Sequence, residues 1–374
     1  MEVCQHLWQN GQFTPELTAE SPDLILLFGN EAAREALPLL QQRYPDRVIS
    51  GCSTSGEIAQ QTVMDESAAI SLINFSATKI RSFSSIVENI EDSFYQAQSL
   101  ARQAAAHDLQ HLLIFADGLC INANEVVSGA TTALAPFNNI SGGVAGDGDR
   151  FEKTYTYDQQ GAHSNRILML GFYGDKLQAS CGCYGGWDAF GPMRRVTRSE
   201  GNRLYELDGQ SALELYKRYL GDYAKDLPAS GLRFPLHLRR DENDPNPVVC
   251  SVLGTDEEDG CIIFGADLPE NYLVQLMRAN LDRLIDGAHT ASEQACRDAE
   301  QYQPQFALMI SCVGRRAVLQ QLVDEELETL EDTLSQKIPH TGFYSYGEIA
   351  PNMGVGPCNL HNQTMTITTF AEQE

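Results

Sequence analysis

Short apolar runs alternate with amphipathic stretches along the chain, and this alternation predicts helices packed on sheets. Three segments share one order of elements: an apolar strand, a helix, and a Gly/Ser-rich turn. The predicted strands are residues 24–28, 111–116 and 306–311, and the predicted helices are residues 31–43, 124–135 and a long acidic helix with leucines from Leu319 to Leu334. Because parallel strands need such a crossover, we expect an α/β (mixed α+β) fold.

The first and third segments also agree in sequence. Residues 51–59 (GCSTSGEIA) and 342–350 (GFYSYGEIA) share Gly, Gly, Glu, Ile and Ala in the same register. Sequence similarity at equivalent places in two units indicates an internal repeat. We therefore expect two pseudo-repeated halves whose equivalent turns face each other.

The middle of the chain has the pattern of antiparallel strands. Residues 153–157, 167–173 and 177–183 predict a central antiparallel meander, and residues 248–253 and 261–264 predict a hairpin around an acidic loop. Between these regions lies a stretch rich in turn-forming residues. We place a domain boundary at residues 190–230.

Composition narrows the range of functions. The chain has 26 Lys and Arg against 51 Asp and Glu, a formal charge of −25. Nucleic acids and anionic membranes are bound through clustered Lys and Arg, so both are unfavourable partners. No apolar run approaches the ~20 residues of a membrane span, and the first residues do not resemble a signal peptide. We expect a cytoplasmic protein with reduced cysteines.

Candidate chemistry is sparse. Cys52 and Ser53 lie on a Gly-bounded turn and could serve a hydrolase or transferase, but the turn has one residue too many for the G-x-S-x-G nucleophile elbow. The glycine run at residues 142–149 lacks the G-x-G-x-x-G order of dinucleotide sites. Non-covalent haem needs only an axial side chain in an apolar pocket, and His237 and His361 are candidates.

Several motifs in order along the chain resemble the FIST family. They are residues 51–58 (GCSTSGEI), 141–148 (SGGVAGDG), 342–349 (GFYSYGEI) and 360–364 (LHNQT). The resemblance covers roughly residues 20–370 and leaves no room for a kinase, cyclase or other output domain. It implies a FIST N-type domain at residues 20–210 and a FIST C-type domain at residues 225–370.

The resemblance implies a bacterial, cytoplasmic sensory protein, not an enzyme, that binds a small ligand and regulates a separate signalling partner. The ligand would be haem b sensing nitric oxide, with a histidine kinase or a cyclic-di-GMP enzyme as partner. The alternative ligand is a small molecule such as an amino acid, with Glu57 or Glu348 meeting the ammonium group and Arg194, Arg195 or Arg198 the carboxylate.

The repeat also permits a homo-oligomer. His361 is the leading candidate for the iron ligand, with His237 in reserve. The expected site residues are His361, Cys52, Ser53, Ser55, Glu57, Gly143, Tyr344, Tyr346, Glu348 and Asn362.

Overall fold

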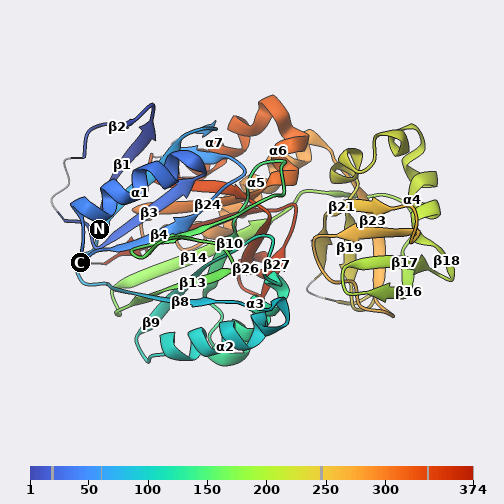
Figure 1. Ribbon diagram of the computed structural model, residues 1–374, viewed down its shortest axis with the longest axis horizontal. Helices are drawn as coiled ribbons and strands as arrows, with labels where there is room; N and C mark the ends of the chain where they lie inside the picture. Colours follow the sequence, from blue (N-terminus) through green and yellow to red (C-terminus); the bar gives the residue numbers. More distant parts are fainter. Residues whose placement is uncertain (18–20, 60, 245–246, 335–336, 374) are drawn as a thin grey trace.

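The computed structural model describes the whole chain except residues 18–20, 60, 245–246, 335–336 and 374. It contains a large core built from three sheets and a smaller β-rich domain beside it (Figure 1). The smaller domain is an insertion in the core, because the chain leaves the core after β14 (Leu177–Tyr184) and returns at α5 (Leu281–Ala295). The expected α/β class is confirmed.

Each core sheet is centred on one parallel strand pair with antiparallel neighbours. The first sheet runs β12 (Gly161–His163), β11 (Thr156–Asp158), β4 (Val48–Cys52), β3 (Leu24–Gly29), β7 (Ala68–Asn74), β1 (Glu2–Gln9), β2 (Gln12–Thr14). The second runs β27 (Cys358–His361), β26 (Gly347–Pro351), β10 (Ile140–Val144), β9 (Leu109–Ala116), β13 (Arg166–Tyr173), β8 (Lys79–Ile86). The third runs β14, β28 (Met365–Glu372), β24 (Phe306–Cys312), β25 (His340–Ser345), β5 (Glu57–Ala59), β6 (Thr62–Met64).

The three parallel pairs are structural repeats. We call β3 with β4 the first unit, β9 with β10 the second, and β24 with β25 the third. In each unit a glycine lies at the same register position, Gly51 opposite Leu27, Gly142 opposite Ile114 and Gly342 opposite Met309. A Cβ atom on these glycines would lie 1.8, 1.9 and 1.7 Å from the facing carbonyl oxygen. The predicted repeat of the first and third segments is therefore present, and the middle segment is a third copy.

The units exchange strands in a ring. The strand that follows the turn of the first unit, β5, pairs with β25 of the third. The strand that follows the turn of the third unit, β26, pairs with β10 of the second. The strand that follows the turn of the second unit, β11, pairs with β4 of the first. The core is thus a closed three-unit arrangement and not two facing halves.

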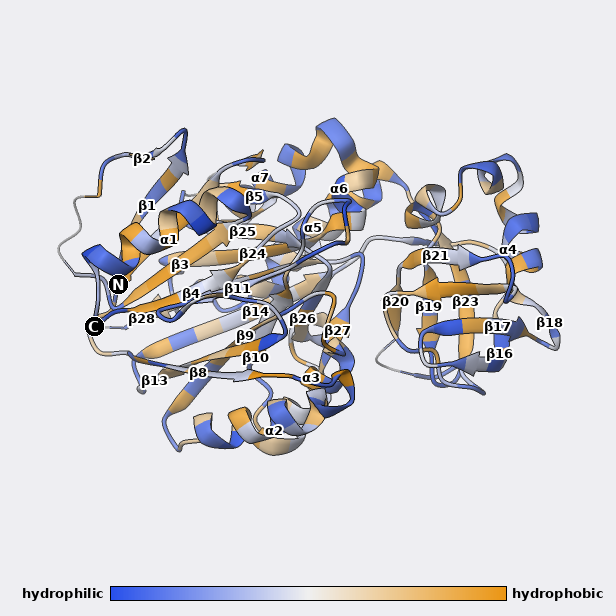
Figure 2. Ribbon diagram, viewed as in Figure 1, coloured by the Kyte–Doolittle hydropathy of each residue, from blue (hydrophilic) through white to orange (hydrophobic). Residues whose placement is uncertain are grey.

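Apolar side chains from all three sheets fill the centre of the core. Phe28 stacks on Phe343 with ring centroids 4.8 Å apart, and Phe115 lies 5.6 Å from Phe28 and 6.0 Å from Phe343. The strands β3, β9 and β24 are therefore buried along almost their whole length and consist mainly of apolar residues, as strands covered on both faces do. Figure 2 shows these strands as apolar bands between helices of mixed polarity.

Helices cover the outer face of each sheet. The first sheet is covered by α1 (Glu31–Arg43), the second by α2 (Ser93–Ala104) and α3 (Ala123–Leu134), and the third by α5 and α7 (Val323–Leu334). The predicted acidic helix is broken near its start: α6 (Val313–Leu319) ends at Leu319, the next residue, Gln320, has a left-handed φ of 54°, and the short helix η4 (Gln320–Leu322) leads into α7. The other short helices of the core are η1 (Ile90–Asp92) and η5 (Asn352–Gly354).

The predicted central meander is wrong. β13 and β14 are consecutive along the chain, but β13 pairs with β8 and β9 in the second sheet while β14 pairs with β28 in the third. Both strands are rich in buried residues because each serves a different sheet of the closed core. Local alternation cannot distinguish this crossing from a meander.

The small domain has its own apolar core, which includes Tyr216, Val252 and Phe264. Its sheet runs β20 (Val248–Cys250), β19 (Leu236–Arg239), β23 (Leu273–Arg278), β16 (Arg194–Glu200), β17 (Arg203–Leu207), β22 (Cys261–Phe264), β21 (Val252–Asp256), with β15 (Asp188–Ala189) on β23 and β18 (Gln210–Ser211) on β17. Its helices are α4 (Ala212–Leu220), η2 (Gly221–Asp226) and η3 (Ala229–Arg233). The predicted hairpin is present as β21 and β22, but its first strand is residues 252–256, whereas residues 248–250 of the predicted strand form β20 and pair with β19. Among the described residues of the whole chain, no helix is long and apolar enough to cross a membrane.

Candidate functional site

The turns of the three units meet at the carboxyl ends of their parallel strands. Each turn donates a backbone hydrogen bond to the next, so that the bonds form a ring. They are Ser55 N to Tyr344 O (2.7 Å), Tyr346 N to Val144 O (3.4 Å) and Gly146 N to Ser53 O (3.0 Å). Ligands of open α/β sheets bind beyond the carboxyl ends of the strands, so a ligand site is expected at the surface around this ring.

Two of the turns hold a buried carboxylate in the same way. The hydroxyl of Thr54 donates to Glu57 (2.6 Å), and the hydroxyl of Ser345, three residues before Glu348, donates to Glu348 (2.6 Å). A second hydroxyl reaches each carboxylate, from Ser67 at 3.1 Å and from Thr364 at 2.9 Å. Burial raises the pKa of Glu57 and of Glu348 to about 7. These carboxylates bind no exposed group and close the turns internally.

The turn of the second unit differs, because its acid is held ionised. Asp147 accepts backbone N–H bonds from residues 151, 152 and 153 and a hydrogen bond from the Tyr346 hydroxyl. Burial alone would raise the pKa of Asp147, but these hydrogen bonds lower it below its ordinary value. The turn of the third unit is thereby tied to the turn of the second.

The largest cavity in this region, the turn cavity, has a volume of about 940 Å³. The turn cavity is lined by residues from all three units: residues 54–56 of the first turn, residues 148–150 after the second turn, and Val313 and Arg316 of α6, together with Asn30 and Glu66. Arg316 donates to the Ser55 carbonyl (2.5 Å) and forms an ion pair with Asp65 (2.6 Å). All three units therefore contribute to one wall.

A second cavity, the interdomain cleft, lies between the core and the small domain and has a volume of about 390 Å³. Leu119 and Tyr346 of the core face Leu253 and Phe264 of the small domain across it. Asp267 is its one charged residue within the described part of the chain. The cleft suits a largely apolar, uncharged molecule.

Of the expected site residues, Ser55 lines the turn cavity and Tyr346 lines the interdomain cleft. Cys52 is fully buried, and the Ser53 hydroxyl accepts from the Tyr155 N–H (2.9 Å). Gly143 is packed under Ile310 and Phe343, where a Cβ would lie 2.9 Å from Ile310. These three positions serve packing and the closing of the turns. Burial raises the pKa of the Cys52 thiol well above its ordinary value, which opposes nucleophilic use.

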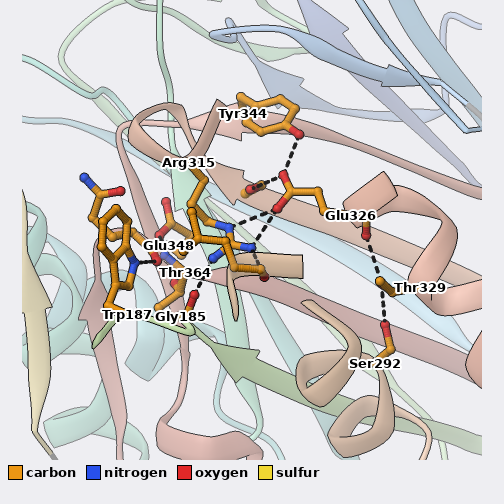
Figure 3. Close-up of polar contacts among 12 residues, drawn as sticks. Gly185, Trp187, Ser292, Arg315, Glu326, Thr329, Tyr344, Glu348 and Thr364 are labelled. Carbon is orange, nitrogen blue, oxygen red and sulfur yellow. Dashed lines mark hydrogen bonds and ion pairs between the residues drawn. The ribbon is translucent and has the colours of Figure 1, made fainter. Parts of the chain in front are cut away.

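Tyr344 belongs to a buried polar cluster that the sequence did not indicate (Figure 3). Its hydroxyl donates to Glu326 (2.6 Å), which also accepts from Ser311 (3.0 Å) and pairs with Arg315 (2.8 Å). Neither side chain of the Arg315–Glu326 pair is exposed. Glu326 lies in α7, which contains six acidic residues, and this composition predicts a solvent-exposed position. Its burial is therefore evident only from the structure.

The two histidines considered as haem ligands both have polar partners inside the protein. His361 is 4% exposed; its Nε2 lies 3.1 Å from the Ala350 carbonyl and its ring also hydrogen-bonds to Cys183. Both polar edges of the ring are therefore occupied, and none of the cavities described here reaches it. His237 lies on β19 of the small domain, where its Nδ1 is 3.2 Å from Arg239. The structure does not bring the two histidines to one pocket.

The motif around His361 instead joins the two domains. Asn362 accepts from the Ser251 N–H (3.3 Å), and Gln363 donates to the Leu232 carbonyl (3.2 Å). Trp187, on the outgoing connection, donates to the Gln363 carbonyl (2.7 Å). Asn362 is thus an interdomain contact in the structure.

The arginines considered for a carboxylate ligand all lie on β16. Arg194 pairs with Asp208 (3.1 Å), Arg195 donates to the Asn271 carbonyl (2.8 Å), and Arg198 lies over the Tyr205 ring. These arginines belong to the small domain, whereas Glu57 and Glu348 are buried in the turns of the core. The arginines and the two carboxylates therefore do not form one site. Within the described residues, no group of three or more His, Cys, Asp or Glu could hold a metal ion.

Comparisons with known proteins agree with the motifs. The chain matches the FIST N domain over residues 23–210 and the FIST C domain over residues 212–351. An uncharacterized protein of Methanocaldococcus jannaschii is 27% identical over 221 residues, which cover 56% of this chain and 41% of that protein, so the match spans about two fifths of the relative's length. The ranges 20–210 and 225–370 expected for the two domains stay a prediction.

Among solved structures, the chain is similar to a cyanuric acid hydrolase from A. caulinodans, with 9% identity, 99% coverage of both chains and a TM-score of 0.35. A likeness at that level carries no argument about activity. The FIST N match alone spans half of the chain, and the glycine turns of its two units occupy equivalent places in the structure. The chain belongs to the FIST family.

Proposed function

We propose that this protein is a sensor whose ligand is a small zwitterion, an amino acid being the simplest, bound in the turn cavity. FIST domains are associated with small-ligand sensing in signalling. The observation that carries the proposal is the charge around the cavity. Arg150 has no hydrogen-bond or ion-pair partner among the described residues, and the carboxylates of Glu66 and Asp149 stand beside it in the lining without partners in the same part of the chain.

The groups match the two ends of a zwitterion. An arginine binds a carboxylate through two parallel N–H bonds, and Arg150 is exposed and available for this role. Glu66 or Asp149 would meet the ammonium group. The Arg316 guanidinium is already committed to Asp65, whose pKa it lowers, so it shapes the wall instead of binding ligand.

The proposed signal is a change in the conformation of residues 148–150, which form part of the wall of the turn cavity. Residues 148–150 follow Asp147, which accepts a hydrogen bond from the Tyr346 hydroxyl. Tyr346 also lines the interdomain cleft. A ligand on Arg150 would favour the conformation in which this connection is tight, and a ligand shifts an equilibrium only by such a difference in affinity. The state would be read by a separate partner, for which a histidine kinase or a cyclic-di-GMP enzyme in a bacterial cytoplasm is the class that the family resemblance implies.

Calorimetric titration with the twenty amino acids tests the proposal. We expect at least one to bind, Arg150→Gln to weaken it at least tenfold, and Arg102→Gln, an exposed arginine on the far helix α2, to leave binding unchanged. If no amino acid binds, or if Arg150→Gln binds as tightly as Arg102→Gln, the proposal is wrong.

Haem and catalysis give distinct outcomes. Haem b sensing of nitric oxide remains an expectation from the family resemblance, and the geometry at His361 gives it no support. A Soret band after haem reconstitution that is lost in His361→Ala would restore it. Ester or amide turnover that disappears in Cys52→Ser would favour the hydrolase alternative, which the burial of Cys52 opposes.

A further inference from the structure

A third cavity, the aromatic cavity, lies where α6 and η4 of the core approach the small domain and has a volume of about 720 Å³. Figure 1 shows α6 on the side of the core that faces this domain. Val318 and residues 319–322 form the core side, and the small domain forms the other. The turn cavity and the aromatic cavity share one lining residue at the end of α6, Gln320.

Four aromatic rings line the small-domain side: Phe190, Tyr219, Tyr223 and Phe234. Tyr223 and Phe234 lie 5.3 Å apart in a tilted arrangement. Tyr223 is 50% exposed although its ring is large and apolar. Rings left open around a cavity offer faces on which a planar ligand stacks.

Two arginines stand together at this cavity. Arg233 and Arg278 both line it, and the Ala279 N–H donates to the Arg233 carbonyl (3.1 Å), which sets the two residues side by side. The Arg278 guanidinium lies 5.7 Å from the centre of the Phe190 ring. Within the described residues neither guanidinium has a carboxylate or carbonyl partner.

The lining contains no carboxylate among the described residues, although the chain has 51 Asp and Glu. Elsewhere in the small domain three arginines form ion pairs, Arg194 with Asp208, Arg203 with Asp256 and Arg240 with Asp241. Two unpaired guanidinium groups in a cavity without acids leave a local positive potential on an acidic protein. Such a potential favours an anion.

We infer that the aromatic cavity binds a small molecule that carries a carboxylate or phosphate on an aromatic body. The arginines would hold the anion by forked N–H bonds, and the rings would cover the planar part. The site is separate from the turn cavity, and no part of the inference rests on the zwitterion proposal. Because the cavity has one wall on each domain, its ligand would also fix the small domain against α6.

A matched series of naphthalene probes tests this inference by calorimetry: 1-naphthylacetate, 1-naphthyl phosphate and the neutral 1-naphthylacetamide. We expect one or both anions to bind and the amide to bind at least tenfold more weakly. Arg278→Gln and Arg233→Gln should each weaken the anion at least tenfold. Arg218→Gln, an exposed arginine on α4 outside the lining, is the control and should bind normally.

The outcomes separate the possibilities. Tighter binding of the acetate or of the phosphate supports the inference and shows which anion the two arginines hold better. Equal binding of amide and anion, failure of both anions to bind, or arginine variants that behave as Arg218→Gln would overturn the inference. Circular dichroism of each variant confirms folding, and Arg150→Gln should leave probe binding unchanged, which separates this site from the turn cavity.

Discussion

The Arg315 guanidinium and the Glu326 carboxylate lie 2.8 Å apart, and neither side chain is exposed to solvent. The same guanidinium donates to the Gly185 carbonyl (2.5 Å) and to the Leu284 carbonyl (2.7 Å). Gly185, which Figure 3 labels, lies on the outgoing connection, and Leu284 lies in the first turn of α5, where the chain returns to the core. One buried ion pair thus fixes both points at which the domain joins the core.

Arg315→Met should destabilise the protein strongly. Removing one partner leaves an unpaired charge in the interior, which typically costs about 3–5 kcal/mol. We expect a loss of that size in urea unfolding of the core. The double variant Arg315→Met with Glu326→Leu should recover part of it, because no charge then remains buried. A single variant within about 1 kcal/mol of the natural protein would show that solvent reaches the pair.

Local pattern predicted the strands and helices whose apolar spacing is complete. The expected helix over residues 31–43 matches α1, and the repeated glycine turns mark equivalent places in the fold. The sequence comparison did not reveal the second unit, because its turn has Asp147 in place of a Glu and is one residue shorter than the turns of the first and third units. The fold keeps the three turns equivalent despite the missing residue, whereas a comparison of sequences in one fixed register loses the match.

The site was harder to predict than the fold. The turn motifs indicated the right region, yet most of their side chains point inward and close the turns. Arg150, Arg233 and Arg278 belong to no motif, and only the cavities single them out. Cavities form between segments distant along the chain, here α6 with residues 148–150 and with the small domain. The spacing of residues along the sequence does not indicate that these segments lie close together in space.

Each close-approach glycine should be intolerant of alanine. A Cβ at position 342 would lie 1.7 Å from the Met309 carbonyl oxygen, so the paired strands would have to separate. We expect Gly342→Ala, and equally Gly51→Ala, to cost roughly 3 kcal/mol as severe overpacking of a core. Gly254→Ala is the control, since its nearest neighbour atom would be 3.9 Å away. Similar melting temperatures for the control and the Gly342 variant would contradict the register.

Asn362→Ala should loosen the small domain without unfolding it. The variant loses the hydrogen bond to Ser251 (3.3 Å), a contact worth about 1 kcal/mol, while the small domain keeps its own apolar core. We expect faster amide exchange in both connections and unchanged exchange in the strands of the core. Asn359→Ala is the matched control, because within the described residues its side-chain amide donates to the nearby Pro357 carbonyl alone. Equal exchange in the two variants would argue against an interdomain role.

Glu57 and Glu348 should make stability fall as the pH rises. Their pKa is about 7 in the folded protein and near the ordinary 4.5 when unfolded. Between these values the folded state keeps protons that the unfolded chain releases, so each group reduces stability by up to about 1.4 kcal/mol per pH unit. Glu57→Gln and Glu348→Gln mimic the protonated side chain. We expect each variant to gain stability relative to the natural protein from pH 4.5 to 7, with no further gain above pH 7.

Glu372→Gln provides the opposite sign in the same experiment. Although burial would raise it, hydrogen bonds from the N–H groups of residues 76–78 and from the Thr78 hydroxyl lower the pKa of Glu372 to about 2. Its stabilising effect is therefore complete above pH 4.5 and is lost as the pH falls towards 2. Glu372→Gln should be less stable than the natural protein at neutral pH, with a difference that shrinks in acid. Urea unfolding of the three variants at pH 3, 4.5, 6 and 8 measures both trends, and parallel pH profiles for Glu57→Gln and Glu372→Gln would exclude the buried, protonated state assigned to Glu57.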